Sequence, residues 1–157
     1  MKKSIKKGFG FGITSGIITT LGLIVGLYSG TNSKFIVLGG IFMIAIADSL
    51  SDALGIHISE ESVNKNKNEI WESTVSTFVF KFIFASIFII PFLFLQLKTA
   101  IIFCVVMGLL MLSIFSYYIS REHKTNPVTV ILEHLIIAIV VIIITYFAGF
   151  FVSGFAG

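Results

Sequence analysis

The sequence predicts an all-α, polytopic membrane protein with five transmembrane helices. Hydrophobic residues make up 56% of its 157 residues and charged residues only 12%, and the mean hydropathy of +1.03 is far above that of soluble domains. The apolar residues form five runs, each long enough for a helix to cross a hydrocarbon core of about 30 Å. A helix satisfies its own backbone hydrogen bonds, as lipid requires. We therefore expect a single transmembrane domain covering residues 1–157.

The first two expected spans cover residues 9–28 and 35–58. The lysine-rich start resembles a secretory signal, but the apolar run is too long and no small-residue cleavage site follows it, so we expect a retained span. Glycines recur here at four-residue intervals in two sets: Gly12 and Gly16, then Gly22, Gly26 and Gly30. This spacing lets helix backbones approach closely and predicts a central packing helix or a dimer seam, unless it reflects only the frequency of glycine in membrane helices.

Three further spans are expected: residues 75–97, 100–119 and 128–151. Pro91 removes one backbone hydrogen bond and predicts a kink near the end of the third span. Only the short break at residues 96–99 separates the third span from the fourth. Asn126 as N-cap and Pro127 at the first helical position predict where the fifth span begins.

The lysines and the arginine predict the orientation. Most of them lie on the side of the N-terminus: Lys2, Lys3, Lys6, Lys7, Lys65, Lys67, Arg121 and Lys124. Only Lys34 and Lys98 lie in the alternate loops, so we expect the N-terminus in the cytosol and the C-terminus outside. Because the basic residues lie where topology requires them, we expect a lipid bilayer and no nucleic acid as partner. The lack of a processing segment indicates a prokaryotic plasma membrane.

Two aspartates lie within the second expected span. Asp48 and Asp52 are four residues apart, which is one helical turn, so both carboxylates share one face. A charge near the bilayer centre costs a few kcal/mol by insertion scales, and acids in this position usually have a function. The pair therefore predicts a site for a cation.

Other polar residues are expected at a similar depth. Four of them lie five or six positions inside the cytosolic boundary of their spans: Ser15, Asp52, Lys81 and Glu133. At 1.5 Å per residue this depth is roughly 8–9 Å. His134 follows Glu133, and Asp48 lies one turn deeper than Asp52. These positions predict a polar cavity that opens toward the cytosol.

The charges of this layer do not balance, because Asp48, Asp52 and Glu133 oppose only Lys81. The surplus carboxylates must hold protons or a metal, and a divalent cation that binds them releases the protons. Exchange of metal for protons follows. Alternatively, Lys81 and Glu133 extend to the interface or pair with each other, Glu133 interacts with a helix dipole, and His134 forms a hydrogen bond in the packing.

His57 and Glu61 are one turn apart where the second span leaves the membrane. They predict a collecting site for metal, although such residues often belong to a solvated surface. The candidate metal ligands are Asp48, Asp52, Ser15, Glu133, His134, His57 and Glu61. We expect a transported divalent metal and no permanently bound cofactor. The single cysteine, Cys104, provides neither a disulfide framework nor a cysteine metal cluster.

Two motifs resemble those of a known family. Residues 12–26 read G-I-T-S-G-I-I-T-T-L-G-L-I-V-G and residues 49–59 read S-L-S-D-A-L-G-I-H-I-S. The first resembles G-x-x-D-G-L-V-T-T-L-G-L-V-x-G and the second is similar to A-L-S-M-x-x-G-E-Y-x-S, both of the vacuolar iron transporter family. The resemblance implies a five-helix homodimer that exports iron or manganese by proton antiport, with the metal route lined by the first two helices of both subunits.

The departures from these motifs concern the charged positions. Ser15 replaces the aspartate of the first motif, Asp52 replaces the methionine of the second, and Ile56 replaces its glutamate. Asp48 is an additional acid, and residues 60–71 stand where many members carry a long acidic helical insertion. A carboxylate is a harder ligand than a thioether and favours Mn²⁺, with Fe²⁺ as the other candidate.

Two other functions are weighed against transport. Paired aspartates also occur in CDP-alcohol phosphotransferases, but Asp48 and Asp52 reproduce only the last spacing of that motif, and Ile44 stands where its glycine belongs. No serine elbow or HExxH motif is present, so we expect a transporter rather than an enzyme. The remaining alternative is a membrane scaffold or subunit whose buried acids only fix the helix register.

Overall fold

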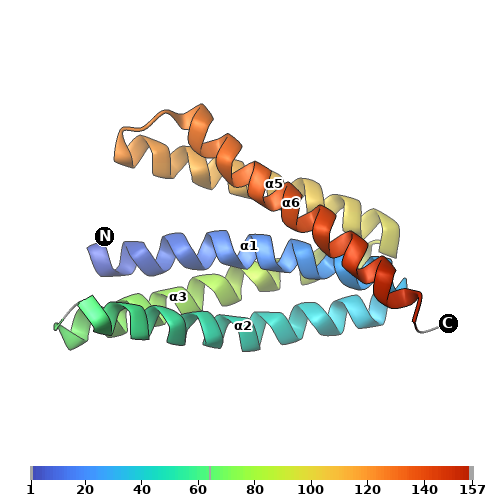
Figure 1. The fold of residues 1–157 in the computed structure, drawn as a ribbon, viewed down its shortest axis with the longest axis horizontal. Helices are drawn as coiled ribbons and strands as arrows, with labels where there is room; N and C mark the ends of the chain where they lie inside the picture. Colours follow the sequence, from blue (N-terminus) through green and yellow to red (C-terminus); the bar gives the residue numbers. More distant parts are fainter. Residues whose placement is uncertain (1, 64, 156–157) are drawn as a thin grey trace. The chain divides into compact units, whose positions relative to one another are not determined.

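The computed structural model describes residues 2–63 and 65–155. Within these residues the chain forms helices α1 (Lys3–Thr31), α2 (Lys34–Val63), α3 (Lys67–Ile87), α4 (Ile89–Phe94), α5 (Leu97–His123) and α6 (Pro127–Ser153) (Figure 1). Among the described residues, five helical segments are long and apolar enough to cross a membrane, with α3 and α4 together forming one of them. The predicted all-α protein with five spans is confirmed.

The helices extend beyond the apolar runs that predicted them. Helix α1 begins at Lys3 and α2 continues to Val63, whereas the expected spans began at residue 9 and ended at residue 58. An apolar run marks the part of a helix that faces hydrocarbon, but the backbone hydrogen bonds continue into the interface, where water solvates the polar side chains. This extension brings Lys3, Lys6 and Lys7 onto α1.

The kink predicted from Pro91 is confirmed. Helix α3 ends at Ile87, Phe88 is its C-cap, and α4 begins at Ile89. Pro91 has no N–H group to donate to the carbonyl of Ile87, so the regular helical bond is missing there. The Phe88 N–H group instead donates to the carbonyl of Ala85 at 3.3 Å, a tighter turn. The break before the next span is shorter than predicted, because α5 already begins at Leu97.

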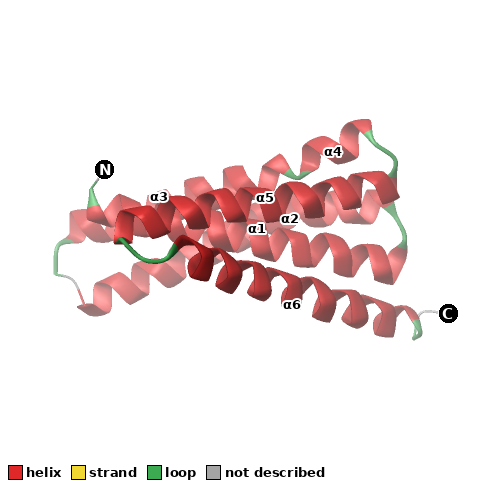
Figure 2. Cartoon of the chain, turned by 90° about the horizontal axis from the view of Figure 1, so that it is seen from above, coloured by secondary structure: helices red, strands yellow, loops and turns green. Residues whose placement is uncertain are grey.

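The predicted start of the last helix is also confirmed. The Asn126 side chain accepts a hydrogen bond of 3.0 Å from the backbone N–H group of Val128, and Pro127 occupies the first turn of α6. Helix α5 ends at His123, and its C-cap residue Lys124 has a left-handed backbone (φ 55°) that turns the chain out of the helix. The two helices consequently lie side by side (Figures 1 and 2).

Backbone contacts divide the chain into two compact units. The first unit comprises residues up to Thr20 together with Ile41–Ile89, and the second comprises Leu21–Gly40 together with the residues from Ile90 onward. In the first unit, the start of α1, the end of α2 and the start of α3 lie at the same end (Figure 1). The first unit contains the two aspartates.

Glycines of α1 allow close helix packing in both units. In the first unit, a Cβ atom on Gly12 would lie 2.8 Å from the carbonyl oxygen of Thr77 on α3. In the second unit, a Cβ atom on Gly26 would lie 3.2 Å from the carbonyl oxygen of Thr145 on α6. The absence of side chains at these positions lets the helix backbones meet, so the predicted role of the glycines in central packing is confirmed.

Candidate cation site

The two aspartates of α2 share a buried lysine of α3. The Lys81 Nζ atom lies 2.5 Å from Asp48 Oδ2 and also forms an ion pair with Asp52 Oδ2. The Lys81 side chain is 1% exposed, whereas those of Asp48 and Asp52 are 30% and 22% exposed. The cation is therefore enclosed, and the carboxylates that bind it reach the surface of the first unit.

Helix α1 completes this group through Ser15. The Ser15 Oγ atom donates a hydrogen bond of 2.7 Å to Asp52 Oδ2 and accepts one of 2.9 Å from Lys81 Nζ. Three helices thus direct four polar side chains toward one point. We call Ser15, Asp48, Asp52 and Lys81 the Lys81 cluster. Its oxygen atoms reach the ammonium from two helices, α1 and α2.

The local sequence explains how the cluster forms. Asp48 and Asp52 share a helix face because they are one turn apart. Gly16 leaves room for the lysine stem beside α1, since a Cβ atom at this position would lie 3.4 Å from Lys81 Cγ and 3.1 Å from the Lys81 carbonyl oxygen. The stem therefore runs against the bare backbone of α1 and carries the ammonium to Ser15.

Two more hydroxyl groups in the first unit are buried without a hydrogen-bond partner among the described residues. They belong to Thr20 on α1 and Ser49 on α2, both 0% exposed. Burial of an unpaired polar group costs about 1–3 kcal/mol. Asp48 Oδ2 also lacks a hydrogen bond, although it forms the ion pair with Lys81. Two hydroxyl groups and one carboxylate oxygen of the described part of the first unit are therefore buried without a hydrogen bond.

The structure decides between the roles that the sequence left open for Lys81. This side chain neither extends to the interface nor depends on Glu133, because its ammonium is buried between Asp48 and Asp52. Counted formally, two carboxylates and one ammonium leave a single negative charge in the cluster. A buried ammonium alone would be far more costly than one beside carboxylates, which explains why these side chains lie together.

The expected ligands of the last span belong to the second unit. Glu133 is exposed on α6, and His134 Nδ1 lies 2.7 Å from the Ser116 Oγ atom of α5. A packing hydrogen bond for His134 was one of the two roles left open by the sequence. A role of Glu133 and His134 in metal binding stays a prediction.

His57 and Glu61 line a common cavity of about 200 Å³ in the first unit. The His57 Nδ1 atom lies 2.9 Å from Thr74 Oγ1, and its ring contacts Trp71 edge-on at 4.8 Å. Lys67 also lines this cavity, and its ammonium opposes a metal ion there. No three His, Cys, Asp or Glu side chains of the described residues lie within reach of one metal ion. The collecting site stays a prediction.

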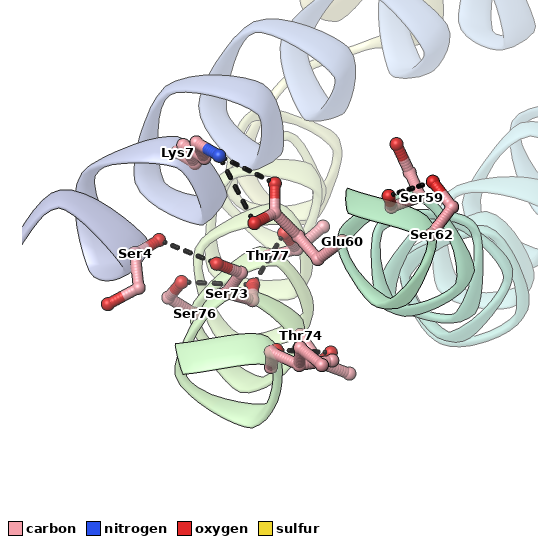
Figure 3. Close-up of polar contacts among 10 residues, drawn as sticks. Ser4, Lys7, Ser59, Glu60, Ser62, Ser73, Thr74, Ser76 and Thr77 are labelled. Atoms are coloured by element: carbon pink, nitrogen blue, oxygen red, sulfur yellow. Dashed lines mark hydrogen bonds and ion pairs between the residues drawn. The ribbon is translucent and has the colours of Figure 1, made fainter. Parts of the chain in front are cut away.

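Sequence reasoning missed another ion pair at the end of the first unit, in which the carboxylate is largely buried and the lysine is half exposed. Lys7 Nζ lies 2.8 Å and 3.1 Å from the two carboxylate oxygens of Glu60 (Figure 3). The Glu60 side chain is 11% exposed, so this residue does not belong to a solvated loop. The signal that could have revealed this pair is that α1 and α2 continue as helices beyond their apolar runs, where Lys7 and Glu60 lie.

A further ion pair at the same end, between Lys2 and Glu72, is more exposed. Ser4 Oγ donates a hydrogen bond of 2.5 Å to Glu72, and Lys2 forms an ion pair with the same carboxylate. The hydrogen bond to Glu72 raises the pKa of the Lys2 ammonium above its usual value. The Ser73 hydroxyl donates to the Ser4 carbonyl at 3.0 Å (Figure 3). The start of α1 is therefore fixed to α3.

Comparison with known families shows the family to which the chain belongs. The model of the VIT family matches residues 56–150, more than half of the chain. The chain belongs to the VIT family. This family of vacuolar iron transporters contains membrane transporters of metal ions rather than enzymes, and the predicted membership is confirmed. The match covers mainly the last three spans, whereas the motifs that indicated the VIT family lie in the first two. No curated protein sequence matches the chain significantly.

Proposed function

We propose that this VIT-family protein exports a divalent metal cation, Mn²⁺ or Fe²⁺, from the cytosol in exchange for protons. One observation carries the proposal: Asp48, Asp52 and Ser15 converge on one buried cation, the Lys81 ammonium. Oxygen atoms that surround an ammonium also suit a metal ion, because both are bound through oxygen lone pairs.

The donor atoms favour a hard ion. The cluster offers two carboxylates and a hydroxyl group, and oxygen ligands suit Mn²⁺ better than they suit softer metals. These donors are fewer than the six of an octahedral site, so water or a second copy of the chain completes the coordination. A homodimer that pairs the first two helices would supply such groups. The exposed apolar side chains of α2, among them Phe42, Met43 and Leu50, suit that contact.

Proton exchange follows from the charge of the donors. Two carboxylates face one ammonium, so the surplus carboxylate must hold either a proton or a metal ion, and a metal that binds it releases the proton. When the metal leaves, protons return to the same oxygens. The partial exposure of Asp48 and Asp52 gives the ion a way in, and the basic start of α1 marks the expected cytosolic end. His57 and Glu61 lie on α2 toward that end and would collect the ion.

Flux measurements test this proposal. Proteoliposomes containing the full chain and a pH-sensitive dye in the lumen receive Mn²⁺, Fe²⁺, Co²⁺ or Zn²⁺ outside. We expect uptake of Mn²⁺ or Fe²⁺ together with a rise in lumenal pH. The Asp48→Asn/Asp52→Asn variant should lose both signals. Glu69→Gln removes an exposed acid at the start of α3 and should retain them. Equal flux in the double variant and the parent would contradict the proposal.

One observation favours a scaffold as the second candidate. Lys81 links α1, α2 and α3 through ion pairs and a hydrogen bond, and such a link can serve only to fix the helices. A scaffold would show no ion-specific thermal stabilisation and no flux. A transporter should melt at a higher temperature with its own metal than with Mg²⁺ at equal ionic strength, because a ligand stabilises the state that binds it.

A further inference from the structure

We propose that the Lys81 ammonium is a tethered cation that occupies the position of the transported metal, and that the metal must displace it. Lys81 would thereby set the affinity of the site and its preference for doubly charged ions. This inference rests on the proposed function, since it assigns a role to a residue that contacts the expected metal ligands.

The contacts of the ammonium are those that a metal would need. Its Nζ atom contacts Asp48 Oδ2 at 2.5 Å, Ser15 Oγ at 2.9 Å, and Asp52 Oδ2. These are the oxygen atoms assigned to the metal by the proposed function. An ammonium and a metal ion cannot occupy this position together, because they would compete for the same space and their two positive charges repel each other.

The tether keeps the ammonium inside the cluster. The Lys81 side chain is 1% exposed, and a Cβ atom on Gly16 would lie 3.4 Å from its Cγ atom. The backbone of α1 therefore holds the base of the stem, while the flexible four-carbon chain lets the ammonium move. An occupant that is covalently attached has a high effective concentration at its site, so it competes with every free cation.

This competition discriminates by charge. Na⁺ or K⁺ brings the same single charge as the ammonium, so it gains little by replacing it beside two carboxylates. A divalent ion interacts twice as strongly with each carboxylate at the same distance. Lys81 would therefore exclude monovalent ions and reduce the affinity for divalent ions, which aids their release on the other side.

Replacement of the lysine by a neutral side chain of similar length tests the competition. Mn²⁺ binding to the purified full chain is measured by calorimetry for the parent, Lys81→Met and Lys81→Arg. We expect Lys81→Met to bind Mn²⁺ at least about fivefold more tightly than the parent, as the lower end of typical site coupling suggests. Lys81→Arg keeps the charge and should show no such gain. In the absence of metal, Lys81→Met should melt at a lower temperature, and Mn²⁺ should restore it while Na⁺ does not.

A charge-balanced variant guards against a folding defect. Lys81→Met/Asp48→Asn retains the single negative charge of the parent cluster without the tethered cation. It should also bind Mn²⁺ more tightly than Lys81→Arg, although it has lost one carboxylate. Binding by Lys81→Met that is equal to or weaker than that of the parent would overturn the inference and leave Lys81 as a structural link.

The outcomes separate this inference from the proposed function. If the parent transports Mn²⁺ and Lys81→Met binds it no more tightly, only the inference fails. If the parent neither binds nor transports metal while Lys81→Met binds it, the lysine is a tethered occupant and the proposed transport by the parent fails. If no variant binds any divalent metal, both fail.

Discussion

Gly16 and Lys81 contact each other across α1 and α3 so closely that a single added methyl group at position 16 would crowd the contact. A Cβ atom on Gly16 would lie 3.1 Å from the Lys81 carbonyl oxygen and 3.4 Å from its Cγ atom. The same surface of α1 carries Ser15, which binds the ammonium at the end of that side chain. The glycine at position 16 therefore accounts both for the close packing of α1 and α3 and for the position of the buried charge.

The first prediction concerns the glycines of α1. Gly12→Ala should destabilise the protein by about 1–3 kcal/mol, because an added Cβ atom overpacks the contact; it would lie 2.8 Å from a carbonyl oxygen of α3. Gly10→Ala is the matched control, since its Cβ atom would meet no atom within 4 Å. Thermal melting in detergent compares the two. A larger loss for Gly10→Ala would contradict the observed packing.

The second prediction ranks the two aspartates. Asp52 binds both Ser15 and Lys81, whereas Asp48 pairs with Lys81 alone among the contacts described for it. We expect Asp52→Asn to destabilise the protein more than Asp48→Asn does. The loss should be about 1–3 kcal/mol, less than for a fully buried pair because the carboxylates are partly exposed.

Ser15→Ala separates the hydroxyl contribution from the charge contribution. This variant should lose about 1 kcal/mol of folding stability, which is the net contribution of a typical hydrogen bond or slightly more. Melting curves of the three single variants at one ionic strength provide the ranking. If Asp48→Asn melts lowest, Asp48 and not Asp52 is the main partner of the lysine.

The third prediction concerns the ion pair between Lys7 and Glu60. The Glu60 side chain is 11% exposed, whereas the Glu72 side chain of the neighbouring pair with Lys2 is 25% exposed. Burial limits screening by salt. Lys7 is itself 47% exposed, so in double-mutant cycles with Lys7→Met and Glu60→Gln we expect a coupling of at most about 1 kcal/mol that high salt reduces only in part. The cycle with Lys2→Met and Glu72→Gln should give a smaller coupling that salt abolishes.

The fourth prediction concerns alkaline pH. The hydrogen bond to Glu72 raises the pKa of Lys2 above the usual 10.5. A raised pKa means that the folded state holds the proton more tightly than the unfolded state does. The contribution of this pair is therefore fully present below the usual pKa and is lost as pH rises through the raised one. The parent should lose a small amount of stability above about pH 10, whereas Lys2→Gln should not show this loss. Melting temperatures of the two proteins, measured as a function of pH, give the difference.

Local sequence signals determined the elements of this protein. The apolar runs predicted the five spans, Pro91 predicted the break between α3 and α4, and Asn126 with Pro127 predicted the start of α6. Each of these features depends on interactions within about one helical turn or on contact with lipid, so residue type and spacing suffice to predict it. The shared face of Asp48 and Asp52 belongs to the same class, because it follows from helix periodicity.

The partner of the buried charge was decided only by tertiary structure. Lys81 is separated from Asp52 by 29 positions and from Ser15 by 66, and its depth in the span fitted an interfacial lysine, a pair with Glu133 or a pair with the aspartates equally well. Depth fixes the position of a residue along a helix, but the rotation of that helix about its axis fixes which neighbour it meets. Here the close approach of α1 and α3 at Gly12 and Gly16 sets that rotation, so the cluster arises from packing across helices that no local pattern encodes.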